Sequence, residues 1–259
     1  NAKIYKYALK SSADFSLKIF EKDFNGMKMS INGLEVWTKL IGEFNAYNIL
    51  ATYSLAKAYD LIEDKILNNI SALETVEGRF EKISKNGISK IGIVDYAHSP
   101  DSIKKILQTL NELKAKDEFL ITVIGCGGDR DVDKRPLMGK IAASLSDKVV
   151  FTSDNPRFED PKSILKQIKS GVEYKDLHKV SIIVDRKKAI KYACEINSKN
   201  DVILIAGKGH DKFQIFGDSK IDFDDKKILE EFLINTPSEF DNGYSYYFLW
   251  LSICFNRDC

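Results

Sequence analysis

The pattern of apolar and polar residues changes once along the chain. In residues 1–40, short alternations such as Phe15–Phe20 predict β-strands, and the Asn25-Gly26 pair is typical of a hairpin turn. Residues 43–57 and 60–72 carry apolar side chains at helical spacing. The first part of the chain is therefore predicted to hold several short strands followed by two helices.

From Gly78 onward, short apolar runs alternate with helical stretches. The runs are almost wholly apolar, as expected of strands that are covered on both faces. This alternation favours an α/β fold with a mostly parallel sheet that carries helices on both faces. The predicted strands are residues 91–94, 119–124, 149–152, 180–184 and 202–206, and the predicted helices are residues 100–113, 136–145, 161–168 and 186–196.

The change of pattern predicts a domain boundary near residues 76–88. We expect one domain to end at about residue 79 and a second domain to occupy residues 80–235, which is long enough to fold alone. The tail, residues 236–259, crowds aromatic side chains into a segment too short to span a bilayer. The sequence assigns this tail no role.

Composition excludes several classes of protein. The 259 residues are 44% hydrophobic and 30% charged, so the chain can bury a core and is not disordered throughout. Its 39 basic and 38 acidic residues give a net charge of +1, which argues against a broad nucleic-acid-binding face. No apolar run reaches the roughly 18 residues that a membrane helix needs. We therefore expect neither nucleic acid nor membrane as a partner.

The cysteines and the first residues bear on the cellular setting. Cys126, Cys194, Cys254 and Cys259 show no paired metal-binding spacing, so we expect no metal site and a reduced cytoplasmic protein. The chain begins with Asn1 and has neither a signal nor a transit sequence at its start. We expect it to be a piece of a longer protein.

Four of the loops that come after the predicted strands carry glycines, carboxylates and cations. In open parallel sheets, ligands bind beyond the carboxyl ends of the strands. Each loop alone has an ordinary explanation, since glycines make tight turns and Asp, Asn and Pro favour turns. Four together at one edge of the sheet predict a binding site. The loops are residues 95–100, 125–136, 153–157 and 207–211.

The residue types in these loops suit a small zwitterion. Arg130 and Arg157 offer planar guanidinium groups that match a carboxylate. Asp154 and Asp211 offer anions for an ammonium group, and Asn155 can both donate and accept. A ligand with carboxylates and amines would satisfy all of them.

The same loops, in this order, resemble those of the Mur ligases of peptidoglycan synthesis, specifically the UDP-N-acetylmuramoyl-tripeptide synthetase family. The resemblance covers about residues 5–235 and is highly specific as a set. The matching segments are Gly42-Glu-Phe-Asn-Ala-Tyr-Asn48, Gly78-Arg-Phe-Glu81, Val94-Asp-Tyr-Ala-His-Ser-Pro-Asp101, Gly125-Cys-Gly-Gly-Asp-Arg-Asp131, Lys134-Arg-Pro-Leu-Met-Gly139, Asp154-Asn-Pro-Arg157 and Gly207-Lys-Gly-His210.

The resemblance implies a domain assignment and a reaction. Residues 1–79 would be the end of a central ATP-binding domain, and residues 80–235 a Rossmann-like domain for the incoming amino acid. In the family, ATP activates the carboxylate of UDP-N-acetylmuramoyl-L-alanyl-D-glutamate as an acyl phosphate, with Mg²⁺, and the amine of the third amino acid attacks it. The expected setting is the bacterial cytoplasm, in cell-wall synthesis, cell shape and division.

The resemblance also implies residue roles. Asp154-Asn155-Pro156-Arg157 matches the selectivity motif of the branch that adds meso-diaminopimelate, whose distal carboxylate needs a cation that lysine does not. Asp211 stands where the family usually has Glu, one methylene longer. The residues implied for meso-diaminopimelate are Arg130, Asp154, Asn155, Pro156, Arg157, Gly207 and Asp211; those implied for the nucleotide are Asn45, Asn48, Arg79, Asp95, His98 and Lys134.

No catalytic residue or metal ligand is assigned within this chain. It contains no Gly-x-x-Gly-Lys-Thr/Ser phosphate loop, and the family's magnesium ligands would lie upstream with the UDP-sugar domain. We therefore expect the chain alone to be inactive. Alternatives are the same ligase with lanthionine or lysine, a folylpolyglutamate synthetase, or a non-catalytic amino-acid or nucleotide-binding module. A nicotinamide-dependent enzyme is disfavoured because the dinucleotide fingerprint is missing.

Overall fold

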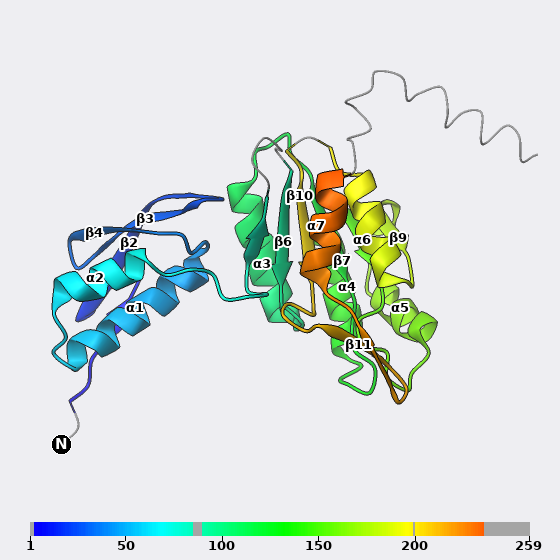
Figure 1. Cartoon of the computed structure of the whole chain (residues 1–259), viewed down its shortest axis with the longest axis horizontal. Helices are drawn as coiled ribbons and strands as arrows, with labels where there is room; N and C mark the ends of the chain where they lie inside the picture. Colours follow the sequence, from blue (N-terminus) through cyan, green and yellow to red (C-terminus); the bar gives the residue numbers. More distant parts are fainter. Residues whose placement is uncertain (1–2, 85–89, 199, 236–259) are drawn as a thin grey trace, which may run out of the picture. The chain divides into compact units, whose positions relative to one another are not determined.

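The structure is a computed structural model that describes residues 3–84, 90–198 and 200–235 (Figure 1). The aromatic tail and the cysteines Cys254 and Cys259 lie outside these residues. Contacts divide the chain into two compact units, one ending at Val76 and the other beginning at Glu77. None of the helices in the described residues is long and apolar enough to cross a membrane.

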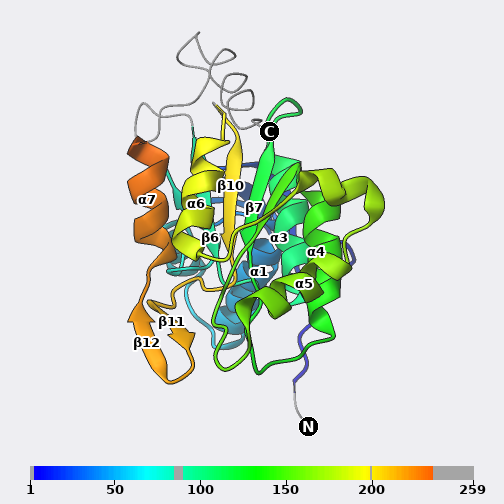
Figure 2. The ribbon, with the colours of Figure 1, turned by 90° about the vertical axis from the view of Figure 1, so that its right-hand side faces the viewer.

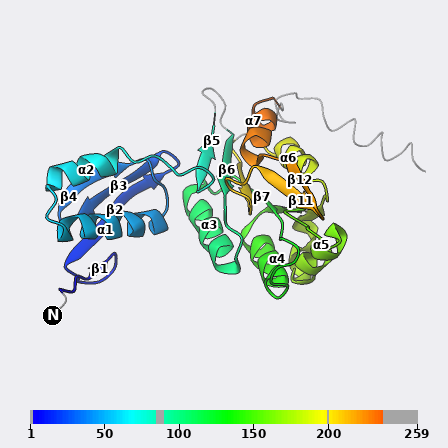
Figure 3. The same ribbon diagram turned by 60° about the horizontal axis from the view of Figure 1, so that its bottom comes forward.

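The first unit is a four-stranded sheet with two helices packed on it (Figure 3). Side chains alternate along the strands: Phe15 and Leu17 are buried while Ser16 and Lys18 are exposed, as the sequence predicted. Strands β2, β3 and β4 are antiparallel, and β1 pairs with β2 in parallel. The elements are β1 Tyr7–Ala8, β2 Phe15–Asp23, β3 Gly26–Ile31, β4 Leu34–Thr38, α1 Glu43–Ala58 and α2 Glu63–Ser71.

The second predicted helix of this unit begins three residues later than the sequence suggested. Asp60 has a positive φ of 56°, and Ile62 is extended with φ −66° and ψ 126°. A helix cannot run through these conformations. The predicted start at residue 60 was therefore wrong, and α2 starts at Glu63.

The second unit is built on a six-stranded sheet with the order β5-β6-β10-β7-β8-β9. Strand β5 is antiparallel to β6, and all other neighbours are parallel, which confirms the predicted mostly parallel sheet. Strands β7 and β10 are buried along their whole length. The strands are β5 Glu81–Ile83, β6 Ile91–Asp95, β7 Leu120–Ile124, β8 Lys148–Phe151, β9 Val180–Ile182 and β10 Val202–Ala206.

Helices cover both faces of this sheet (Figure 2). One face packs against α6 and α7, where Ile190 and Leu229 join Val123 and Ile203 in a buried apolar core. The other face carries α3, α4 and α5, which contact one another in sequence order. The helices are α3 Pro100–Leu113, α4 Lys134–Leu145, α5 Pro161–Ser170, α6 Arg186–Glu195 and α7 Asp225–Asn235, with a 3₁₀ helix at Tyr174–Lys179.

Several elements of this unit were not predicted, and one helix begins at a different residue. Strand β5 has three residues, too few for a pattern, and α7 and the hairpin of β11 (Phe213–Phe216) and β12 (Ser219–Asp222) lie beyond the last predicted strand. Helix α4 begins at Lys134, two residues before the predicted start, because Pro136 is tolerated in the first helical turn, where no N–H partner is needed.

Local capping fixes where the helices on the site side begin. Ser99 caps α3 reciprocally with Ser102. The Asp160 carboxylate accepts hydrogen bonds from the N–H groups of Lys162 and Ser163, both at 3.2 Å, and Pro161 is the first helical residue after it. Because Asp160 caps α5, the loop from Ser153 to Glu159 is fixed at its C-terminal end, where the helix begins.

Candidate functional site

The carboxyl ends of β6, β10, β7 and β8 are neighbours in the sheet, and a cavity of about 260 Å³ lies beyond them. This volume is slightly below the range for small-ligand pockets, about 300–1,000 Å³. Two residues predicted for the nucleotide, His98 and Lys134, also line it. The residues predicted for the amino acid that line the cavity are Arg130, Asp154, Asn155, Arg157, Gly207 and Asp211.

Pro156 is the exception among the residues predicted for the amino acid. It is not among the residues that line the cavity. A Cβ on Gly128 would lie only 1.8 Å from the Pro156 carbonyl oxygen, and the Gly128 N–H donates to the Asn155 carbonyl at 2.9 Å. Pro156 is therefore at the contact between two loops, where only glycine leaves enough room.

Arg157 is held by its main chain and is half-buried. Its φ is 53°, its N–H donates to Ile215 at 3.0 Å, and its carbonyl accepts from Gly217 at 2.7 Å, both in the β11–β12 hairpin. Its Nη1 donates to the Gly128 carbonyl at 2.8 Å. The hairpin, which sequence reasoning missed, thus supports the central cation of the site.

The guanidinium groups of Arg130 and Arg157 are available to bind an anionic ligand. Arg130 is exposed and donates from Nη1 to the Asp129 carbonyl at 3.3 Å. Within the described residues, neither Arg130 nor Arg157 has a carboxylate partner. Cations without a counter-ion at one cavity suit a carboxylate ligand.

Lys208 is a fully buried cation behind the cavity that sequence reasoning did not single out. Its Nζ donates to Asn155 Oδ1 at 3.1 Å and lies 3.5 Å from Asp154 Oδ1. Burial lowers the pKa of Lys208, and the Asp154 carboxylate opposes that shift. The same Asn155 oxygen accepts from the Ile215 N–H at 3.1 Å, so it is already committed to the loop structure.

The acidic side of the cavity is formed by Asp154 and Asp211. Asp154 Oδ1 is buried and accepts no hydrogen bond within the described residues. Gly207 has a φ of 115°, and a Cβ there would lie 3.4 Å from Asp154 Oδ2. Asp211 is half-buried, and no ion-pair partner is found for it in the described part of the chain. Asp211 can therefore accept an ammonium group, whereas the Asp154 carboxylate already lies 3.5 Å from the Lys208 ammonium.

The residues predicted for the nucleotide divide between the two units. Asn45 and Asn48 lie three residues apart on α1 of the first unit, and Asn45 Nδ2 donates to the Ile41 carbonyl at 2.8 Å. The other four belong to the second unit. They are Arg79, Asp95, His98 and Lys134.

In the second unit, Tyr96 joins several of these residues. The Arg79 guanidinium carbon lies 4.6 Å from the centre of the Tyr96 ring, and the rings of His98 and His210 lie 4.8 and 5.2 Å from it. Lys134 Nζ donates to the His98 carbonyl at 2.9 Å. Tyr96 was not predicted, although it stands in the motif that includes Asp95 and His98.

Asp95 is tied to the main chain. Its two oxygens accept hydrogen bonds from the N–H groups of Phe80 and Ala97, each at 2.7 Å. Burial raises the pKa of Asp95, while these N–H groups and Arg79 oppose the shift. Each oxygen of a carboxylate has two lone-pair sites, so each can accept one more bond.

One further side chain limits the chemistry of the site. Cys126 lines the cavity, but burial raises the pKa of its thiol to about 12, which excludes a thiolate nucleophile at neutral pH. Within the described residues, no three His, Cys, Asp or Glu side chains gather as a metal site.

A buried ion pair that the sequence does not predict contacts the main chain of two segments that lead into the cavity loops. Arg186 and Asp225 are fully buried, and the guanidinium donates to the carboxylate at 2.8 and 2.7 Å. Burial disfavours the charged guanidinium, but Asp225 more than offsets this and raises the pKa of Arg186. Arg186 also donates to the carbonyls of Ala206, the last residue of β10, and Ser153, in the loop after β8.

Comparisons with known proteins agree on one family. A family model described as the Mur ligase, glutamate ligase domain matches residues 78–209. The UDP-N-acetylmuramoyl-L-alanyl-D-glutamate–2,6-diaminopimelate ligase of Cytophaga hutchinsonii is 46% identical over 233 residues, 90% of this chain and 47% of the relative. The ligase of that name from Syntrophomonas wolfei is 43% identical over 231 residues, 88% of this chain and 47% of the relative.

Solved structures show the same similarity. The structure of a UDP-N-acetylmuramoyl-L-alanyl-D-glutamate–2,6-diaminopimelate ligase aligns with a TM-score of 0.65 at 32% identity, over 90% of this chain and 48% of that one. The UDP-N-acetylmuramate–alanine ligase of Thermotoga maritima shares the fold, with a TM-score of 0.63 at 22% identity, over 89% of this chain and 47% of that one. The chain spans about half the length of the curated relatives it matches.

Proposed function

Because this chain belongs to the Mur ligase family, we propose that it supplies the amino-acid site of an ATP-dependent peptide ligase. The reaction is the addition of meso-diaminopimelate to UDP-N-acetylmuramoyl-L-alanyl-D-glutamate, in peptidoglycan synthesis. The names of relatives 41–46% identical to this chain support this choice. In this proposal, residues 80–235 form the amino-acid-binding domain, and residues 1–79 are the end of the ATP-binding domain.

The observation that carries the proposal is the charge pattern of the cavity. Arg130 and Arg157 present cations without a carboxylate partner in the described residues, and Asp154 and Asp211 present anions at the same cavity. meso-Diaminopimelate carries a carboxylate and an amine at each end. The site therefore offers a complementary charge for both kinds of group.

These residues bind and orient the incoming amino acid rather than change it chemically. Arg157, held by the β11–β12 hairpin, is assigned to the distal carboxylate, and Asp211 to the distal amine. Fixing one end of the ligand restricts the reactive amine at the other end, and such positioning lowers the entropic part of the barrier. In this proposal, ATP transfers a phosphoryl group to the carboxylate of UDP-N-acetylmuramoyl-L-alanyl-D-glutamate and forms an acyl phosphate.

The nucleotide residues of the second unit fit an anionic, aromatic ligand. Lys134 is a half-buried cation with no carboxylate partner among the described residues, which suits a phosphate oxygen. Arg79 stacks on Tyr96 beside His98, and Asp95 keeps lone pairs for a ribose hydroxyl. Asn45 and Asn48 are assigned to the adenine. Mg²⁺ is proposed to accompany ATP, with ligands outside this chain.

Three alternatives would use the same site: lanthionine as the substrate, lysine as the substrate, and a non-catalytic binding module. Lanthionine carries the same four charged groups as meso-diaminopimelate, and lysine lacks the distal carboxylate. A non-catalytic module that binds an amino acid or a nucleotide would use the same cavity. The unneutralised Arg157 favours a ligand with a distal carboxylate over lysine.

Turnover distinguishes these alternatives. The full-length protein that contains these residues is incubated with ATP, UDP-N-acetylmuramoyl-L-alanyl-D-glutamate and one of the three amino acids, and the products are identified by mass. We expect tripeptide with meso-diaminopimelate, and no phosphate release from the 259-residue chain assayed alone. Equal product from lysine would refute the assigned substrate, and no product from any amino acid would favour the binding module.

A further inference from the structure

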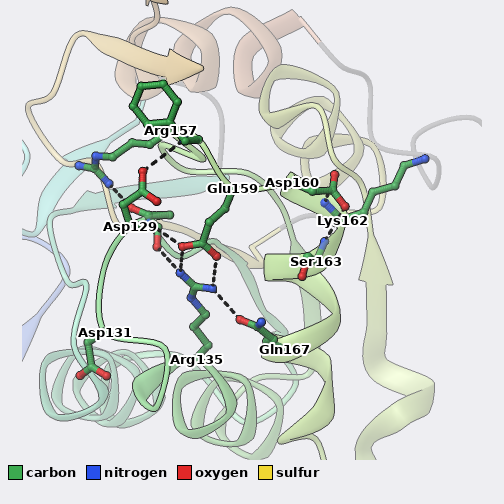
Figure 4. A network of polar contacts seen from close by, with 12 residues as sticks. Asp129, Asp131, Arg135, Arg157, Glu159, Asp160, Lys162, Ser163 and Gln167 are labelled. Carbon is green, nitrogen blue, oxygen red and sulfur yellow. Dashed lines mark hydrogen bonds and ion pairs between the residues drawn. The ribbon is translucent and has the colours of Figure 1, made fainter. Parts of the chain in front are cut away.

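Arg135, at the start of α4, is a fully buried arginine that has no part in the proposed binding of amino acid or nucleotide. Its guanidinium donates to Glu159 through Nη1 at 2.7 Å and through Nη2 at 2.8 Å. Nη1 also donates to Gln167 Oε1 at 2.6 Å, and Nη2 to the Gly127 carbonyl at 3.1 Å. One side chain thus connects α4, α5 and the two loops beside the cavity (Figure 4).

Glu159 extends this network to the glycine loop. Its Oε1 accepts from the Asp129 N–H at 2.6 Å, and Asp129 Oδ2 accepts from the Phe158 N–H at 3.2 Å. Figure 4 shows the contacts that run from Gln167 through Arg135 and Glu159 to Asp129. The loop after β7 and the loop after β8 are therefore joined by side chains as well as by main chain.

Arg157 lies inside this joined segment. It stands next to Phe158, and its Nη1 donates to Gly128, which is next to Asp129. Both Arg157 and Asp129 have positive φ, 53° and 52°. Such conformations are costly for residues with side chains and persist where surrounding contacts hold them. Asp129 is held by Glu159, and through it by Arg135, whereas the main chain of Arg157 is held by the β11–β12 hairpin. The Arg157 guanidinium is joined to the Asp129 loop by its hydrogen bond to the Gly128 carbonyl.

The pair is poorly explained as a stability element alone. Arg135 is fully buried while the Glu159 side chain is 27% exposed, so the arginine loses its hydration and the pair need not stabilise the fold more than apolar residues of the same size would. Arg135 also leaves its buried Nε–H without a hydrogen-bond partner in the described residues. A role in fixing one loop geometry accounts for a buried cation that packing alone does not require.

We propose that Arg135 and Glu159 are positioning residues, which set the orientation of the Arg157 guanidinium at the cavity by joining the two loops. The proposal rests on the proposed function, in which Arg157 binds the distal carboxylate of the amino acid. It predicts that the pair governs selectivity for that carboxylate. Arg135 and Glu159 themselves do not touch the ligand.

The first test needs no ligand. The 259-residue chain is labelled with ¹⁵N-arginine, and the Nε–H signal of Arg157 is assigned by its loss in Arg157→Ala. Glu159→Gln and Arg135→Lys are each expected to shift or broaden this signal. The control is Glu173→Gln, which removes a carboxylate that pairs with Lys140 of α4 but contacts neither loop. An Arg157 signal unchanged in a folded Glu159→Gln or Arg135→Lys variant would overturn the proposal.

The second test measures selectivity. Glu159→Gln is expected to weaken binding of meso-diaminopimelate about tenfold and to leave that of L-lysine within about twofold. In the Arg157→Ala background, Glu159→Gln should not weaken binding of meso-diaminopimelate any further, because the guanidinium that Glu159 positions is absent. Equal losses for both ligands, or the same loss in both backgrounds, would refute positioning. A wild-type chain that binds both ligands equally would refute the proposed function, while the Arg157 signal would still decide the positioning role.

Discussion

The Nη1 atom of Arg157 donates a 2.8 Å hydrogen bond to the main-chain carbonyl of Gly128, in the neighbouring loop. This bond fixes where the guanidinium lies but does not neutralise its charge, because a carbonyl is a neutral acceptor. The cation is therefore oriented before any ligand arrives. A preorganised cation of this kind is what recognition of a second carboxylate requires.

Removal of this cation should change selectivity. Arg157→Ala is expected to weaken binding of meso-diaminopimelate by about 1.5–3 kcal/mol, the usual value for a hydrogen bond to a charged group. L-Lysine has no distal carboxylate, so its affinity should change little. Calorimetric titration of the variant with both ligands measures the two losses. Equal losses would show that Arg157 does not contact the distal carboxylate.

The absence of a side chain at Gly127 leaves room for the Arg157 guanidinium. A Cβ at this position would lie 2.9 Å from Arg157 Nη1 and 3.6 Å from Arg130 Cγ. Gly127→Ala should therefore displace the Arg157 guanidinium and reduce the preference for meso-diaminopimelate over L-lysine. In the Arg157→Ala background the substitution should have little effect, because the colliding atom is absent. A full effect in that background would point to a general disturbance of the loop.

Asp211 tests the amine-binding side of the cavity. Asp211→Asn removes the charge at nearly constant shape and should weaken binding of ligands that carry a distal amine. Asp211→Glu keeps the charge and adds one methylene of reach, so it should retain or improve binding. Calorimetric titration of both variants and of the wild type with meso-diaminopimelate measures these changes in affinity. An unchanged affinity in Asp211→Asn would mean that this carboxylate does not reach the ligand.

The Arg135–Glu159 pair should make stability depend on pH. Hydrogen bonds from Arg135 and from the Asp129 N–H lower the pKa of Glu159 from its usual 4.5 to about 2. Because the folded state lowers this pKa, the contribution to stability is complete above about pH 4.5 and is lost as the pH falls towards 2. The Tm difference between the wild type and Glu159→Gln should be largest at neutral pH and shrink below pH 4.5. A difference that stays constant over this range would contradict the pairing.

Much of the second unit could be predicted because its strands are apolar runs between helical stretches. The carboxyl ends of β6, β7, β8 and β10 meet because the sheet is parallel, so the loops that carry chemistry could be found at the end of each run. The sequence therefore predicts that Arg130, Asp154 and Asp211 share one site, and all three line the same cavity.

The rest depended on contacts that span long stretches of the chain. Lys208 meets Asn155 across 53 residues, and Arg186 meets Asp225 across 39. No periodicity marks such pairs, and a lysine or arginine in a loop or helix usually faces solvent. The β11–β12 hairpin was missed although it contacts Arg157, because its strand β12 is exposed along its whole length and carries no apolar pattern.

The most direct test of the account is calorimetric titration of the 259-residue chain with meso-diaminopimelate and with L-lysine, after its folding has been confirmed. The cavity with its oriented Arg157 predicts binding of meso-diaminopimelate and at least tenfold weaker binding of L-lysine, about the effect of one charge-assisted contact. Equal affinities for the two ligands would contradict the assignment of Arg157 to a distal carboxylate, and with it the proposed substrate.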